Sequence, residues 1–134
     1  MNRRAFFRGL AVLPVTALAT PAFAGPRNAA PPAVVVYHFV TPNCEDCHRW
    51  DLRHLPRWLN SGEYHRCLYR RIEGKTAADA LDPDNWPSSA RAFAASLTQT
   101  PAFLVMRQGR PMVAASGEDA WVKVIWPAIR RAAA

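Results

Sequence analysis

The stretch VVVYHFVTPNCEDCH, residues 34–48, decides the fold of this chain. Residues 34–40 are β-branched or carry rings, and the TPN that follows ends the run, which predicts a short buried strand. The CxxC after it is predicted to open a helix. Two cysteines at this spacing are typical of a redox dithiol, whereas CEDCH, residues 44–48, also matches an attachment site for c-type haem. The stretch alone leaves both chemistries open.

The first 24 residues have the composition of a cleaved export signal. They combine a basic start, an apolar core at residues 10–19 and a small-residue cleavage site at 22–24. Within them NRRAFFR, residues 2–8, resembles the twin-arginine export signal, although a general secretory signal with paired arginines is the alternative. The apolar core is too short to span a membrane. We therefore expect a periplasmic protein with no stable membrane span after cleavage.

Removal of the signal lowers the formal charge from +7 to about +4, because three arginines leave with it. The remaining basic residues are too diffuse to indicate nucleic-acid binding.

Residues 25–33 contain three prolines and predict a loose arm. Residues 34–134 are predicted to form one domain. Disulfides persist in the periplasm, so the three cysteines suggest one reactive pair and one leftover thiol, Cys67, which we expect to be buried and inert.

The rest of the chain alternates between helical and strand patterns. We predict a helix from the CxxC to about residue 60, with a kink at Pro56, and then a strand over 64–72. A polar loop over 73–87 is predicted to lead into a helix that a serine caps and that runs from 88 or 89 to 97. A hairpin over 102–106 and 112–115 and a last helix from 116 or 117 are predicted to complete the chain. Pro111 fits the hairpin only if its second strand is an edge. This order predicts an α/β fold with a mixed central sheet of about four strands flanked by helices.

The last helix carries apolar residues at helical spacing. They are Trp121, Val124, Ile125, Ala128 and Ile129. This pattern predicts a stripe that faces the core.

A strand, a CxxC at a helix start, Thr100-Pro101 before a hairpin and a terminal helix together resemble the thioredoxin superfamily over nearly all of the predicted domain. The resemblance implies a thioredoxin-like fold and a redox-active disulfide between Cys44 and Cys47. It also implies that Pro101 is cis and that the backbone of Thr100 binds the substrate strand. Its implied partners are protein thiols and disulfides and a membrane or periplasmic electron donor.

The two cysteines are predicted to have different roles. Cys44 lies at the first turn of the helix, where unpaired N–H groups and the helix dipole stabilise a thiolate, so we expect it to be the nucleophile. Cys47 lies on the same side one turn later and can resolve the mixed disulfide. Glu45 and Asp46 each disfavour the thiolate by on the order of 1 kcal/mol or less. This favours a reducing or isomerising dithiol over a strong oxidant.

His38 stands six residues before Cys44, where thioredoxins proper carry a buried acid. It is a candidate catalytic residue that could move a proton to or from Cys47. The alternative is a strand histidine whose hydrogen bonds are satisfied by a neighbour.

Two rival functions use the same cysteines. A c-type haem would need Cys44 and Cys47 as thioethers, His48 as proximal ligand and Met112 as a distal one. A Cu(I) or Zn(II) carrier would use the thiolates with His48, His54 or His38. We favour the dithiol, which needs no cofactor and no metal, because the strand before the CxxC and the Thr-Pro after it have no role in a small cytochrome c.

Overall fold

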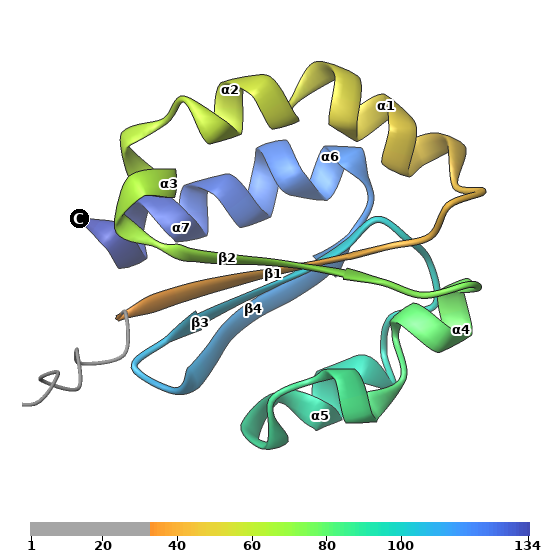
Figure 1. The fold of residues 1–134 in the computed structure, drawn as a ribbon. Helices are drawn as coiled ribbons and strands as arrows, with labels where there is room; N and C mark the ends of the chain where they lie inside the picture. Colours follow the sequence, from red (N-terminus) through yellow and green to blue (C-terminus); the bar gives the residue numbers. More distant parts are fainter. Residues whose placement is uncertain (1–32) are drawn as a thin grey trace, which may run out of the picture.

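A computed structural model of the protein describes residues 33–134. The predicted export signal and the predicted arm up to residue 32 lie outside the described residues. The described part has three layers, with helices on both faces of one sheet (Figure 1).

The sheet has four strands in the order β2-β1-β3-β4. The strands are β1 Val34–Val40, β2 Leu68–Glu73, β3 Ala102–Arg107 and β4 Arg110–Ser116. β1 pairs in parallel with β2 and antiparallel with β3, and β3 pairs antiparallel with β4. The mixed four-stranded sheet predicted from the sequence is therefore confirmed. β4 is an edge strand, as Pro111 requires.

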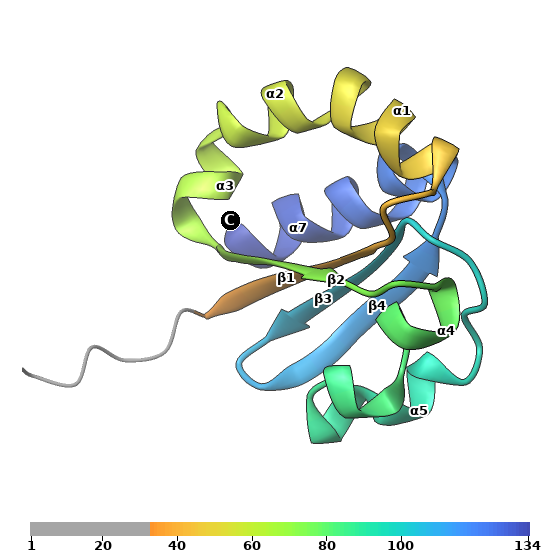
Figure 2. The same cartoon turned by 45° about the vertical axis from the view of Figure 1, so that its right-hand side comes forward.

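The two faces of the sheet are covered by different sets of helices (Figure 2). One face carries α1 Glu45–Arg53, α2 Leu55–Leu59, α3 Gly62–Arg66, α6 Glu118–Ala120, the π-helical turn η3 Trp121–Ile125 and α7 Trp126–Ala133. The other carries α4 Ala77–Ala80, α5 Arg91–Ala94 and the short 3₁₀ turns η1 Pro83–Asn85 and η2 Ser88–Ala90. Among the described residues, no helix is long and apolar enough to cross a membrane.

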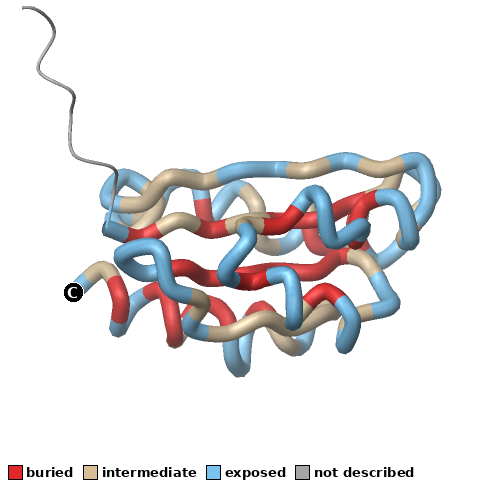
Figure 3. The backbone as a smooth tube through the Cα atoms, turned by 90° about the horizontal axis from the view of Figure 1, so that it is seen from below, coloured by how far each residue is buried: buried red, intermediate tan, exposed pale blue. Residues whose placement is uncertain are grey.

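Each side of the sheet has its own buried cluster. On the α1 side, four tryptophans meet edge to face or tilted between the helices and the sheet; they are Trp50, Trp58, Trp121 and Trp126. On the α4 side, the rings of Phe39 and Trp86 stack with centroids 4.5 Å apart. The central strands β1 and β3 are buried between these clusters, whereas the loops at both ends of the sheet are exposed (Figure 3). The core thus fixes β1, and with it the start of α1.

The helix after the CxxC is broken near the predicted kink. α1 ends at Arg53, and Pro56 lies in the first turn of α2, where its missing N–H costs no hydrogen bond. The break lets two short helices follow the curved surface of the tryptophan cluster.

The predicted strand over 64–72 is wrong in its first half. Residues Gly62–Arg66 form α3, because the Ser61 side chain accepts a hydrogen bond from the Tyr64 N–H and caps the helix. The Tyr64 ring then packs edge to face on Trp58. Cys67 follows as the last residue before β2, half-buried and outside any disulfide, and burial raises the pKa of its thiol.

The predicted loop and the helix after it also differ from the structure. The loop contains α4, which starts with a reciprocal capping box between Thr76 and Asp79. The predicted helix over 88–97 is reduced to η2 and α5, with no side-chain cap. Ser89 does not cap a helix, because its hydroxyl donates to the Gly109 carbonyl in the hairpin turn.

The predicted stripe on the last helix is correct except at one position. η3 is a π-helical turn, which adds a residue to the turn and shifts the faces of the helix that follow. Val124 is therefore 39% exposed, and Trp126 is buried. The other predicted stripe residues are buried.

Candidate functional site

Cys44 is the N-cap residue of α1, directly after the turn that ends β1. Its Sγ accepts a hydrogen bond from the Cys47 N–H at 3.0 Å, so the sulfur faces the unpaired N–H groups of the first helical turn. This geometry favours negative charge on Cys44, because the helix dipole and the N–H groups both stabilise it.

Cys44 and Cys47 form a disulfide, with their Cα atoms 5.1 Å apart. The two sulfurs differ in access, since Cys44 is partly exposed whereas Cys47 is 1% exposed. An incoming substrate can therefore reach Cys44 but not Cys47.

Thr100 and Pro101 lie beside the disulfide, although they are more than fifty residues away in sequence. The bond between them is cis, and the Thr100 carbonyl oxygen is 3.2 Å from Cys44 Sγ. The Thr41 and Thr100 hydroxyl oxygens are 3.3 Å apart, which joins the turn before α1 to the segment that enters β3. The Pro101 carbonyl accepts from the Gly117 N–H at 2.8 Å, so the start of α6 is held at the same place.

The two acidic residues between the cysteines share one partner. The Arg49 guanidinium donates to Asp46 at 2.8 Å and to Glu45 at 3.1 Å. These pairs are exposed and therefore weak, yet they offset part of the negative charge near Cys44.

His38 is fully buried on β1, on the face that packs against α1. Its ring stacks on Phe103 at 4.5 Å and lies 4.3 Å from the Trp50 ring. Burial lowers the pKa of His38 well below its ordinary value of 6.5, and the nearby Arg71 guanidinium lowers it further. His38 is therefore neutral at pH 7.

The His38 ring forms one side-chain hydrogen bond in the described part of the chain. Nδ1 lies 2.7 Å from the Tyr69 hydroxyl, and which group donates depends on which ring nitrogen carries the proton. Nε2 is buried and has no hydrogen-bond partner among the described residues.

Tyr69 and Arg71 extend this buried cluster towards the surface. Arg71 forms a bidentate ion pair with Asp51 of α1, with both nitrogen–oxygen distances 2.7 Å. Burial raises the pKa of Tyr69 to about 12, so its hydroxyl keeps its proton. Tyr69, Arg71 and Asp51 were not predicted from the sequence as part of the site. Tyr69 and Arg71 alternate in a strand that pairs in parallel with β1, so their side chains share one face of the sheet, and this pattern could have indicated the cluster.

The residues of the two rival functions are not brought together. Met112 lies near the hairpin end of the sheet, whereas the CxxC follows the opposite end of β1. A ring nitrogen of His48 lies 2.9 Å from the Pro42 carbonyl oxygen, and His54 pairs with Glu118 at 3.0 Å. Over residues 33–134, no group of three or more potential ligand side chains is placed to hold a metal ion.

Two solved structures show the same arrangement of the sheet and helices. The thioredoxin of Malassezia sympodialis matches with a TM-score of 0.50 and 17% sequence identity, over 78% of this chain and 80% of its own. The periplasmic thioredoxin SoxS of Paracoccus pantotrophus, in its reduced form, matches with a TM-score of 0.50 and 24% identity, over 75% of this chain and 95% of its own. The chain has a thioredoxin fold. No protein-family model and no curated protein sequence matches this chain.

The thioredoxin fold explains the position of the site. The CxxC, the cis proline and the start of α6 meet at one end of the sheet, where β1 leads into α1 (Figure 1). Cys44, Cys47, Thr100 and Pro101, all predicted from the sequence, lie together there. His38 lies beneath α1 within the core.

Proposed function

We propose that this protein is an exported thiol–disulfide oxidoreductase that acts on protein disulfides in the reducing or isomerising direction. The observation that carries the proposal is the disulfide at the start of α1, with Cys44 accessible, Cys47 buried and the cis Thr100–Pro101 bond beside them. The periplasmic location rests on the sequence of residues 1–24, and the periplasmic neighbour SoxS supports it.

Reduction of a substrate disulfide would take place in two exchanges. The Cys44 thiolate attacks one substrate sulfur, the substrate S–S bond breaks, and one substrate thiolate leaves. Cys47 loses its proton to a substrate thiolate formed in the exchange and attacks Cys44 Sγ; the Cys44–Cys47 disulfide forms, the bond between Cys44 and the substrate breaks, and the second substrate sulfur leaves. The protein loses two electrons and the substrate gains them. A membrane or periplasmic dithiol must then restore the reduced form.

Thr100 would hold the substrate during the first exchange. Its carbonyl lies 3.2 Å from Cys44 Sγ, at the entrance to β3. An extended substrate segment that pairs with the backbone here brings its disulfide to Cys44.

We propose that His38 assists proton movement at Cys47 in the second exchange, and that its Nε2, which has no hydrogen-bond partner in the disulfide form of the site, approaches Cys47 only once the disulfide opens. A second proton on this ring is costly, because the ring is buried and near the Arg71 charge. With its proton on Nε2, the neutral ring would stabilise a buried thiolate by donating to it. A buried acid at this position would instead accept the proton.

The reducing or isomerising direction follows from weak stabilisation of the Cys44 thiolate. The helix start favours it by roughly 0.3 to 1 kcal/mol, and the two exposed carboxylates oppose it by a similar amount. Arg49 offsets part of that opposition. A strong oxidant needs a much more stabilised thiolate.

The test is insulin reduction by dithiothreitol, together with a redox titration of the Cys44–Cys47 pair. We expect the wild type to accelerate the reaction and the variants C44S and C47S to lose the acceleration. The midpoint potential is expected nearer to about −270 mV than to about −120 mV. No acceleration by the wild type would refute the activity, whereas a potential near the upper value would refute only the direction.

A further inference from the structure

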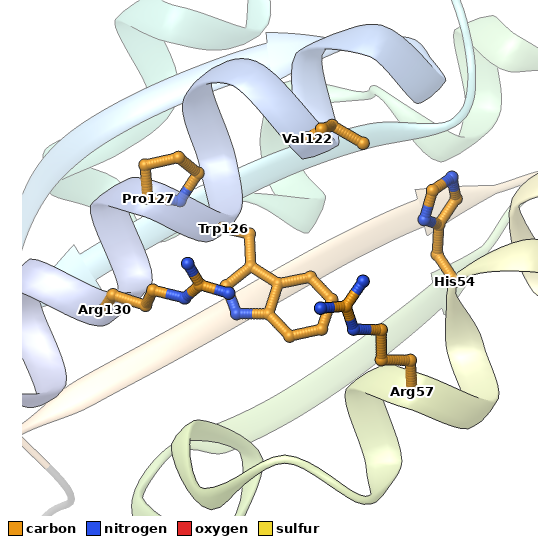
Figure 4. Close-up of a pocket in the computed structure, with 6 residues that line it drawn as sticks. All are labelled: His54, Arg57, Val122, Trp126, Pro127 and Arg130. Atoms are coloured by element: carbon orange, nitrogen blue, oxygen red, sulfur yellow. The ribbon is translucent and has the colours of Figure 1, made fainter.

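A pocket lies between α2 and α7, at the other end of α1 from Cys44. Its volume is about 410 Å³, within the range of small-molecule sites. It is lined by His54, Arg57, Val122, Trp126, Pro127 and Arg130 (Figure 4). None of these residues takes part in the dithiol chemistry, so the pocket is independent of the proposed function.

The pocket is basic. No carboxylate lines it within residues 33–134, and Arg57 forms no ion pair with another described residue. Arg130 pairs with Glu63 through its Nε at 3.3 Å, which leaves its two terminal nitrogens for another acceptor. Two guanidinium groups at one apolar surface favour an anionic ligand.

Trp126 holds both guanidinium groups in place. The guanidinium carbons of Arg57 and Arg130 lie 5.5 Å and 5.4 Å from the centre of its ring, over different ends of the indole (Figure 4). A guanidinium stacked on a ring keeps the N–H donors along its edge free, and its orientation is fixed before a ligand arrives.

The Trp126 ring is itself fixed in the core. The side chain is 8% exposed, and its Nε1–H is buried without a hydrogen-bond partner in the described part of the chain. Because this N–H is covered by protein, it can report a ligand bound above the ring without binding the ligand itself.

The remaining wall of the pocket is apolar. Val122 is 54% exposed although it is a large hydrophobic residue, and Pro127, which lies farther along the helix, also lines the pocket (Figure 4). Val122 belongs to the π-helical turn η3, and such turns occur frequently at functional sites. The wall therefore suits the apolar body of a ligand whose charged group meets the arginines.

We propose that this pocket binds a small organic anion, with a carboxylate or sulfonate group held by Arg57 and Arg130 above the Trp126 ring, and an apolar body against Val122 and Pro127.

The test follows the indole N–H signal of Trp126 in proton–nitrogen correlation spectra of the oxidised protein, assigned with W126F. The probes are naphthalene-1-sulfonate, sodium sulfate as an anion without an apolar body, and 1-naphthol as a neutral ring. We expect naphthalene-1-sulfonate to shift the signal saturably with a dissociation constant below about 1 mM. Sulfate and 1-naphthol are expected to bind at least about tenfold more weakly.

Charge-matched variants separate the pocket from general attraction to a basic protein. R57Q is expected to weaken naphthalene-1-sulfonate binding by about tenfold, because the charge and the paired N–H donors of one guanidinium group are lost. R107Q removes an exposed arginine on β3 that does not line the pocket, and it should leave binding unchanged. Absence of saturation, equal weakening by R57Q and R107Q, or binding of sulfate or 1-naphthol as tight as that of naphthalene-1-sulfonate would overturn the proposal.

Discussion

At the scale of single residues, the buried His38 distinguishes this site from one built on a buried acid. Its ring is neutral, and its Nδ1 lies 2.7 Å from the Tyr69 hydroxyl. We expect the hydroxyl to donate to Nδ1, which leaves the ring proton on Nε2. In the role that we propose for His38, a group that donates then stands where an acid would accept.

The assignment of the His38 proton can be measured directly. Nitrogen chemical shifts of the ring at pH 7 should show a protonated Nε2 and an unprotonated Nδ1. In the variant Y69F the donor to Nδ1 is lost, and we expect the two tautomers to become mixed. Y37F, which removes a hydroxyl from another position of β1, is the control and should keep the wild-type pattern. A protonated Nδ1 in the wild type would contradict the assignment.

The lowered pKa of His38 predicts how stability depends on pH. Below pH 6.5, the ordinary pKa of histidine, the unfolded chain binds a proton at this residue that the folded protein does not. The free energy of unfolding should therefore fall as the pH decreases below 6.5, with a contribution from His38 of up to about 1.4 kcal/mol per pH unit. Above pH 6.5 this contribution is constant.

Urea unfolding of the wild type and H38Q between pH 7 and pH 5 measures this contribution. The difference in slope between them is the expected result. H65Q, which removes an exposed histidine, should keep the wild-type slope. Equal slopes for the wild type and H38Q would show that His38 titrates alike in the folded and unfolded chain.

At the scale of elements, patterns within a few residues were enough to predict β1, the break at Pro56 and the hairpin. The strand predicted over 64–72 began too early, because Ser61 caps a short helix that occupies Gly62–Arg66. α4 was not predicted, although Thr76 and Asp79 have the spacing of a capping box, which is typical of a helix start. Val124 was placed inside because a π-helical turn has no signal in a regular helical period. Each error lies where a cap or an irregular turn determines the structure.

Gly74 is predicted to control the position of α4. A Cβ atom at this residue would overlap the backbone nitrogen of Ala80, which cannot move without the helix. We expect G74A to lower the free energy of unfolding by about 1–3 kcal/mol. At Gly62 a Cβ meets no atom within 4 Å, so G62A should be neutral or stabilising by up to about 1 kcal/mol. Urea unfolding of the two variants makes the comparison, and equal effects would contradict the close packing at Gly74.

At the scale of the whole molecule, the order of elements was sufficient to predict the fold. The CxxC and Thr100-Pro101 were expected to meet because the sequence resembles the thioredoxin superfamily, and the structure places both at one end of the sheet. The cluster of Tyr69, Arg71 and Asp51 was not predicted, because it depends on the register of β2 against β1 and on the position of α1 above both. The pocket at Trp126 likewise depends on how α2 packs on α7.

The export of the protein is a prediction from residues 1–24. If the signal is of the twin-arginine type, joint replacement of Arg3 and Arg4 by lysine should retain the protein in the cytoplasm. The single variant R8K, which keeps the pair, should still be exported. Cell fractionation with immunoblotting compares the two. Normal export of the lysine pair would indicate the general secretory route instead.

The central claim, that Cys44 is the nucleophile of a thiol–disulfide oxidoreductase, is tested most directly by trapping its mixed disulfide. The variant C47S is incubated with insulin, and covalent products are separated without reductant and located by mass spectrometry. The account predicts an adduct through Cys44 that dithiothreitol releases, and no adduct in the double variant C44S/C47S. No adduct in C47S, or an adduct only through Cys67, would contradict it.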